Sequence, residues 1–200
     1  MIRKPRYKVA RRVGEAIYEK TQNPKFAAKQ FPGKGRVQKH RSKTTEYGTQ
    51  LTEKQKIRLS YGVTEKAMQN IMKTIRGQKG SPPELLMQGL ERRMDNVVYR
   101  AGLGKTRIEA RQLVAHGHFT VNGRVCRIPS RRMKIGDVVS LKKSSAEKDV
   151  MKALPAFGKH TPQKWIVRDG VNATVRTLPQ MADADTTLLF AAVTEFYSRN

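Results

Sequence analysis

The chain has 200 residues, of which 41 are Lys or Arg and 16 are Asp or Glu, giving a formal net charge of +25. A folded protein of this charge repels itself unless a polyanion neutralises it, so the composition predicts a nucleic-acid partner. The sequence excludes a membrane-spanning helix, because it holds no run of about 20 apolar residues. It also excludes a disulfide framework and a Cys-rich zinc site, because Cys126 is the single cysteine.

Residues 1–50 are interpreted as a basic N-terminal arm, in which Val13 and Ile17 have the spacing of one short helix. The stretch FPGKGRVQKHRSKTTEYG, residues 31–48, has little apolar surface, so we expect it to stay extended unless phosphates order it. A disordered basic tail that binds nucleic acid without specificity is an equally acceptable interpretation. The arm lacks the apolar core of a secretory signal, and the single cysteine fits a reducing compartment such as the cytoplasm.

Residues 51–76 carry the signals of two helices. Thr52 begins a capping-box spacing, which places the start of the first helix there, and Gly62 is suited to end it. Thr64 is a candidate cap for the second helix, and an apolar stripe that begins at Met68 follows at helical spacing. We expect this methionine-rich stripe to fill a core and not to bind a ligand.

Two further helices follow along the chain. Ser81 precedes two prolines and a glutamate, which is a strong start signal, and the apolar spacing then continues to near Gly102, with Gly89 as a possible interruption. Thr106 and Glu109 form another capping box, which opens a helix that Gly117 ends. Both helices are amphipathic, so each requires an apolar surface to pack against.

The segments after Gly117 have the alternation and the turn residues of β-structure. Their apolar faces provide the surface that the two preceding helices require. The expected strands and turns are, in order, Phe119–Val121, an Asn122-Gly123 turn, Arg124–Ile128, a strand at Val138–Val139, and a hairpin of Trp165–Arg168 and Val171–Arg176. The apolar segment Thr187–Tyr197 is interpreted as a closing strand or a short helix, and the sequence leaves both open.

Cationic side chains recur at helical spacing on the two amphipathic helices. Arg93 and Arg100 are seven residues apart, and Arg107 and Arg111 are four apart, so each pair shares one helix face. Lys105 precedes the second pair. An arginine fork contacts phosphate oxygens in pairs, which favours RNA binding over the alternative of a solvated charged face. Aromatic residues make up only 6% of the chain, so we expect recognition of phosphates and RNA shape rather than base stacking.

No catalytic or metal-binding constellation is visible. Gly104-Lys105-Thr106 resembles the end of a phosphate-binding P-loop, but Tyr99 stands where that motif requires its first glycine. Asp95 falls inside a predicted helix beside arginines, which favours an ion pair over a catalytic role. The histidines have no metal-ligand spacing with Cys126. We therefore expect a protein that is not an enzyme, with no cofactor, no metal and no small-molecule substrate.

The stretch LERRMDNVVYRAGLGKTRIEARQLVAHGHFTVNGR, Leu90 to Arg124, closely resembles the bacterial-type small-ribosomal-subunit protein S-four (S4) family. The stretch EYGTQLTEKQKIRLSYGV, Glu46 to Val63, and the ending EFYSRN are similar to other parts of the same family. The resemblance therefore spans most of the chain. Some members carry a four-cysteine zinc knuckle near the N-terminus, and this chain, with no cysteine before Cys126, is similar to the zinc-free form.

The resemblance implies a structural component of the small ribosomal subunit that binds the 5′ domain of small-subunit ribosomal RNA directly and nucleates assembly of the subunit body. It also implies a place at the messenger-RNA entry region, beside ribosomal protein S-five, and a contribution to translational accuracy. The residues implied on the RNA side of the domain are Arg93, Arg100, Lys105, Arg107, Arg111 and His116. Those implied near the messenger RNA are Arg36, Lys39, Arg41 and Lys43. The implied location is the cytoplasmic ribosome, with an organellar ribosome left open.

The fold expected from these signals is α+β, with a helical N-terminal domain and a small helix–helix–hairpin S-four RNA-binding domain inserted in it or appended to it. The expected segments are a basic arm (1–50), a helical domain (51–90), the RNA-binding domain (91–152), and a C-terminal hairpin with a closing segment (153–200). Two alternatives carry the same RNA-binding module. An RNA-modifying enzyme such as a pseudouridine synthase would need a separate catalytic domain, and a ribosome quality-control factor would lack the similarity at Glu46–Val63.

Overall fold

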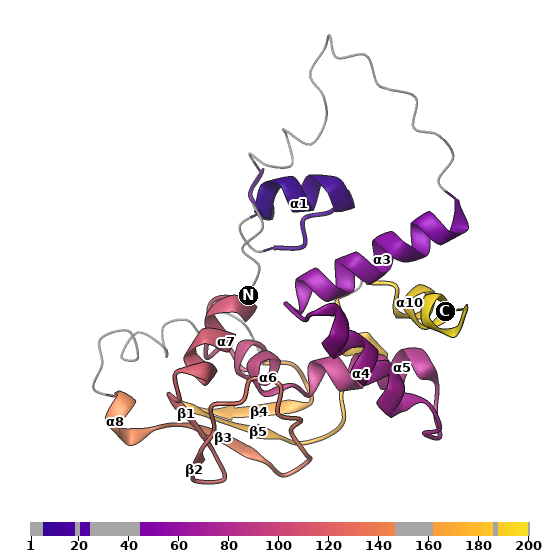
Figure 1. Ribbon diagram of the computed structural model, residues 1–200. Helices are drawn as coiled ribbons and strands as arrows, with labels where there is room; N and C mark the ends of the chain where they lie inside the picture. Colours follow the sequence, from indigo (N-terminus) through magenta and orange to yellow (C-terminus); the bar gives the residue numbers. More distant parts are fainter. Residues whose placement is uncertain (1–5, 19–20, 25–44, 147–161, 186–187, 200) are drawn as a thin grey trace. The chain divides into compact units, whose positions relative to one another are not determined.

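The computed structural model describes residues 6–18, 21–24, 45–146, 162–185 and 188–199 (Figure 1). The chain divides into two compact units, the first comprising residues 1–72 and 188–200 and the second residues 73–187. In the sequence, the second unit is therefore inserted between two parts of the first. Helices occur in both units and the sheet lies in the second, which confirms the α+β expectation.

The first unit is built from helices. Its elements are α1 (Arg6–Val13), α3 (Glu46–Ser60), α4 (Glu65–Ile75, whose last turn falls in the second unit) and α10 (Phe190–Arg199). α10 lies along α3 (Figure 1), with Phe196 near the ring of Tyr47 and beneath the ammonium group of Lys54. Of the two interpretations left open for the closing segment, the helix is the one observed. The C-terminal residues thus complete the N-terminal helical unit.

α3 begins earlier than the sequence predicted. Thr45 is the N-cap, and its Oγ1 accepts a hydrogen bond from the Gly48 amide at 3.2 Å. The predicted start at Thr52 is wrong: Thr52 lies inside the helix and donates its hydroxyl to the Gly48 carbonyl at 2.8 Å. The first turn of α3 is polar and exposed, so apolar periodicity gave no sign of it. The cap predicted for α4 is confirmed, because the Ala67 amide donates to Thr64 Oγ1 at 3.2 Å.

The second unit contains a five-stranded antiparallel sheet of order β2-β1-β3-β5-β4, and α6 and α7 lie over one face of it (Figure 1). The helices are α5 (Pro82–Glu91), α6 (Met94–Arg100), α7 (Arg107–Ala115) and the short α8 (Lys143–Ala146), with a 3-10 turn η3 (Met181–Asp183). The strands are β1 (Phe119–Val121), β2 (Arg124–Val125), β3 (Val138–Leu141), β4 (Ile166–Asp169) and β5 (Asn172–Val175). Val97, Leu113, Phe119 and Trp165 belong to the shared core between helices and sheet.

The single helix predicted from Ser81 to Gly102 is wrong, because the chain forms two helices with a break between them. Arg93 adopts an extended conformation at φ −67° and ψ 139° and forms an isolated bridge with Arg132. The Arg92 carbonyl accepts a hydrogen bond from the Met133 amide at 2.8 Å. A segment some forty positions later therefore takes backbone hydrogen bonds that a continuous helix would make within itself. No glycine or proline stands at the break.

The hairpin predictions are largely confirmed. Asn122 and Gly123 both have positive φ, 50° and 80°, as the tight turn between β1 and β2 requires. β2 ends at Val125 and not at Ile128 as predicted, because the chain leaves the sheet after two residues. The hairpin of β4 and β5 forms and pairs with β3, so it extends the same sheet.

Candidate nucleic-acid interface

Arg93, the N-cap of α6, and Arg100, its last residue, lie within the structure, each held by a different carboxylate. The prediction that they share one helix face is wrong, because Arg93 is extended and lies outside the helix. Arg93 is buried, and its Nε and Nη2 donate to the two oxygens of Asp95 at 3.0 and 2.7 Å. Arg100 is likewise buried, and its guanidinium donates to both oxygens of Glu91 at 3.0 and 2.7 Å. Burying a guanidinium requires such a paired carboxylate, since water no longer solvates the charge.

The arginines of α7 join the same set of contacts. Arg107 donates from Nε to Asn96 Oδ1 at 3.0 Å and from Nη2 to Asp185 Oδ2 at 2.8 Å, and its guanidinium lies 4.6 Å from the centre of the Tyr99 ring. Arg111 donates from Nη1 to Asp95 Oδ2 at 3.0 Å, with 34% of its side chain exposed. Of these two arginines, Arg111 is the more accessible to a phosphate.

Asp185 closes this arrangement from the segment after η3. It bridges two helices, because Arg100 Nη2 approaches its Oδ1 at 3.1 Å while Arg107 reaches Oδ2. Burial opposes ionisation of this carboxylate, but the charges of Arg107 and Arg100 outweigh that effect and hold its pKa below the ordinary value. Four arginines and three carboxylates thus form what we call the α6–α7 ion-pair network. Its members are Glu91, Arg93, Asp95, Arg100, Arg107, Arg111 and Asp185.

Lys105 and His116 lie exposed at the two ends of α7. The N-terminal end is well capped: the Glu109 amide donates to Thr106 Oγ1 at 3.1 Å, and the Lys105 amide donates to Glu109 Oε2 at 2.7 Å. At the other end the ring of His116 stacks parallel to that of His118 with 6.1 Å between centroids. The structure thus brings the six predicted residues onto α6, α7 and their adjoining turns. Their role in RNA binding stays a prediction.

Sequence reasoning did not single out a second group of cations, which begins in β2 and continues beyond it. Five exposed basic side chains occur within eleven residues, on a segment that we call the cationic strap (residues 124–134). They are Arg124, Arg127, Arg131, Arg132 and Lys134. The run RVCRIPSRRMK contains no acidic residue. This run of basic residues without an acidic one could have indicated a cationic surface, but the segment Arg124–Ile128 was interpreted only as a strand.

The four cations predicted near the messenger RNA, Arg36, Lys39, Arg41 and Lys43, lie outside the described residues. Within the part of the chain that is described, no group of three or more His, Cys, Asp or Glu side chains is placed to hold a metal ion. No helix among these described residues has the length and apolar character needed to cross a membrane.

Comparison with known proteins adds a result that covers nearly the whole chain. Two family models match consecutive segments, the ribosomal protein S4/S9 N-terminal domain at residues 1–91 and the S4 domain at residues 92–139. Small ribosomal subunit protein uS4 of Parabacteroides distasonis is 39% identical over 198 residues, covering 98% of this chain and 97% of the relative. The uS4 protein of Chloroflexus aurantiacus is 38% identical over 197 residues, 96% of both chains. Protein uS4A of Symbiobacterium thermophilum is 44% identical over 161 residues, 80% of this chain and 78% of that one.

Proposed function

We propose that this chain, which belongs to the uS4 family of small ribosomal subunit proteins, is a structural component of the small ribosomal subunit that binds small-subunit ribosomal RNA directly. The observation that carries the proposal is the 39% identity that extends over 98% of the chain. The family is structural and non-enzymatic, which confirms the expectation that this chain is not an enzyme.

The charge and the structure support direct RNA binding. A net charge of +25 has to be neutralised by a polyanion in any stable assembly. The α6–α7 ion-pair network holds the guanidinium groups of Arg93, Arg100 and Arg107 by at least two hydrogen bonds each and that of Arg111 by one, so less side-chain entropy remains to be lost when RNA binds. Lys105 and Arg111 offer the accessible positive charge of α7. We infer that this helix faces RNA phosphates.

The finer assignments rest on the family resemblance. We propose that the chain binds the 5′ domain of the ribosomal RNA, that it nucleates assembly of the subunit body, and that it works in the cytoplasmic ribosome. We further propose that it adjoins ribosomal protein S-five and contributes to translational accuracy. The segment with Arg36, Lys39, Arg41 and Lys43 would line the messenger-RNA entry region.

The two alternative functions are disfavoured by the extent of the similarity. A pseudouridine synthase would place a catalytic domain beside the S4 domain, whereas residues 1–91 here match a ribosomal protein domain. A quality-control factor that shares only the S4 domain would not align over 98% of this chain with uS4. Co-sedimentation separates the cases, because a ribosomal protein stays stoichiometric on small subunits after a high-salt wash.

The proposal is tested by binding the purified chain to the 5′ domain of small-subunit ribosomal RNA and to an unrelated structured RNA of equal length, at about 0.3 M salt. We expect a preference of a hundredfold or more, which corresponds to about 2.7 kcal/mol. If about ten phosphates are neutralised, the logarithm of affinity should fall with the logarithm of salt at a slope of roughly −7 to −9. Equal affinity for the two RNAs would contradict the proposal.

A further inference from the structure

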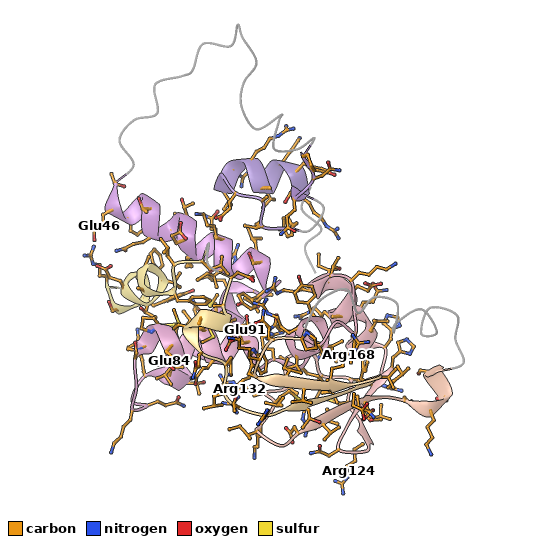
Figure 2. All side chains as sticks on the ribbon, turned by 180° about the vertical axis from the view of Figure 1, so that it is seen from behind. Glu46, Glu84, Glu91, Arg124, Arg132 and Arg168 are labelled. Carbon is orange, nitrogen blue, oxygen red and sulfur yellow. The ribbon has the colours of Figure 1, made fainter. Side chains whose placement is uncertain are left out.

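The cationic strap begins in β2, leaves the sheet after Val125 and then lies against the start of α6. Its buried residues fasten it at both ends, with Cys126 5% exposed and Met133 fully buried in the core of the second unit. Figure 2 shows Arg124 projecting away from the hairpin, and Arg132, near the other end of the strap, is also exposed. The strap therefore combines buried anchors with outward-facing positive charge.

Hydrogen bonds from α6 and the residues just before it hold the strap backbone in place. The Met94 amide donates to the Arg131 carbonyl at 2.8 Å, and the Asp95 amide donates to the Pro129 carbonyl at 3.1 Å. Arg92 Nε likewise donates to the Met133 carbonyl at 2.8 Å, and in the reverse direction the Met133 amide donates to the Arg92 carbonyl at 2.8 Å. These bonds use amides at the start of α6 that have no partner within the helix. A strap fixed in this way presents its side chains from a defined scaffold, which lowers the entropy lost on binding.

The charge on the strap is concentrated and scarcely compensated. Among the described residues, none of the five basic side chains lies within ion-pair distance of a carboxylate. Asp137 is the nearby acid, and its carboxylate accepts the Lys134 amide at 2.8 Å and the Asn122 side chain at 2.8 Å. Burial and the like charge of Arg132 both lower the pKa of Arg92, so the strap also adds repulsion to its neighbour. Because the fold holds these positive charges close together despite their mutual repulsion, a polyanionic ligand is favoured at the strap.

We propose that the cationic strap is a phosphate-binding surface for RNA, contiguous with the C-terminal end of α7 and separate from the α6–α7 ion-pair network. The contact with α7 is direct: Arg127 lies over Gly117, where a Cβ would stand 2.8 Å from its Nε. Strap and α7 together give RNA a longer track of positive charge than the helix alone. The inference deepens the proposed function and rests on it, because it names the residues that take the phosphates.

RNA is favoured over a protein partner by the ratio of charged to apolar side chains. Val125, Ile128 and Ile135 are 47%, 61% and 57% exposed, but along the sequence they alternate with the five exposed cations, which outnumber them. The core of a stable protein interface is depleted in charge, whereas a phosphate surface is not. A protein partner is the other possible outcome, and the experiment below distinguishes it.

The test is a triple variant of the full chain, Arg124→Ala with Arg131→Ala and Lys134→Ala. All three side chains are exposed, and the backbone groups that anchor the strap remain. We expect weaker binding to the 5′-domain RNA and a salt slope that is flatter by up to about three units, near 0.9 per lost phosphate contact. A matched variant loses three exposed cations elsewhere, Lys79→Ala with Lys164→Ala and Arg176→Ala, and we expect less than one unit of change.

A charge-conserving variant controls for any effect of the substitutions on folding. Arg124→Lys with Arg131→Lys keeps the charge and should keep most of the affinity, and all variants should show the same Trp165 fluorescence, since that tryptophan is buried in the second unit. An unchanged affinity and slope in the triple variant would overturn the strap proposal and point to a protein partner. If the unmodified chain shows no preference for the 5′ domain, the proposed function fails, while the slopes still decide whether the strap contacts RNA.

Acetylation of lysines provides a readout that needs no substitution. Lys134 should be protected when the 5′-domain RNA is bound, while the exposed Lys79 and Lys164 should keep their reactivity. Protection of all three lysines to the same degree would mean diffuse coating by RNA. That result would also contradict a defined strap surface.

Discussion

Asp185 accepts a hydrogen bond from Arg107 at 2.8 Å across 78 positions of the chain, and it also contacts Arg100, so it joins an arginine of α6 to an arginine of α7. The two helices also meet through the hydrogen bonds of Arg111 with Asp95 and of Arg107 with Asn96, and through apolar side chains of the shared core. Arg100 and Arg107 thus converge on one carboxylate, each on a different oxygen. The relationship makes the segment after η3 part of the candidate interface.

We expect Asp185→Asn to lower the free energy of unfolding by about 1 kcal/mol at pH 7, a modest value because 36% of the side chain is exposed. The pKa of Asp185 is lowered in the folded chain, so its contribution is present above the unfolded pKa of about 3.9 and is lost as the pH falls through the lower folded value. Urea titrations followed by Trp165 fluorescence at pH 7 and pH 2 should show the difference disappearing in acid. The control is Asp169→Asn, an exposed residue at the end of β4, and an equal effect there would contradict the assignment.

A second prediction concerns the buried pair of Arg93 and Asp95. Asp95→Leu leaves a buried guanidinium without its two-oxygen partner, and we expect a loss of about 3–5 kcal/mol. Adding Arg93→Met removes that orphaned charge, so the double variant should be clearly more stable than Asp95→Leu alone. Arg111 also loses its Asp95 partner in both variants, but its partly exposed guanidinium can be solvated by water. Additive destabilisation in a double-mutant cycle would show that the pair is not coupled.

Local signals accounted for much of the fold. Thr64 and Thr106 cap their helices as predicted, and the Asn122-Gly123 turn is where the sequence placed it. Each of these features depends on residues a few positions apart. The break at Arg93 could not be predicted, because the strap that causes it lies some forty positions away and no breaker residue is present.

The sequence predicted which arginines belong to the candidate site, but it predicted only part of what surrounds them. Helical spacing correctly grouped Arg107 with Arg111, but it could not show that the nearest anions are side chains of the same chain. The partner of Arg107 is Asp185, which no local pattern connects to it. Nothing in the sequence indicated that its C-terminal residues divide between two units. The hairpin of β4 and β5 pairs with β3 in the second unit, whereas α10 packs on α3 in the first.

In the first unit, Tyr197 fastens α10 to α4. Its hydroxyl donates to Glu65 Oε1 at 2.6 Å, and burial together with this hydrogen bond raises the pKa of Tyr197. We expect Tyr197→Phe to lower the free energy of unfolding by about 1.5–2 kcal/mol, because the acceptor is a charged carboxylate. Helix content measured by circular dichroism during urea titration provides the readout. Tyr47→Phe, which also keeps its ring and whose residue is 55% exposed, should change stability far less.

The last prediction tests α7 itself with the double variant Arg107→Ala and Arg111→Ala. We expect weaker binding to the 5′-domain RNA and a salt slope flatter by up to about two units. Arg107 also holds Asn96 and Asp185, so the variant should unfold at a lower urea concentration, and binding has to be measured where circular dichroism shows the fold intact. Gln112→Ala, exposed on the same helix and neutral, is the control. An unchanged slope in a folded double variant would place the phosphates elsewhere on the second unit, with the strap as the first surface to examine.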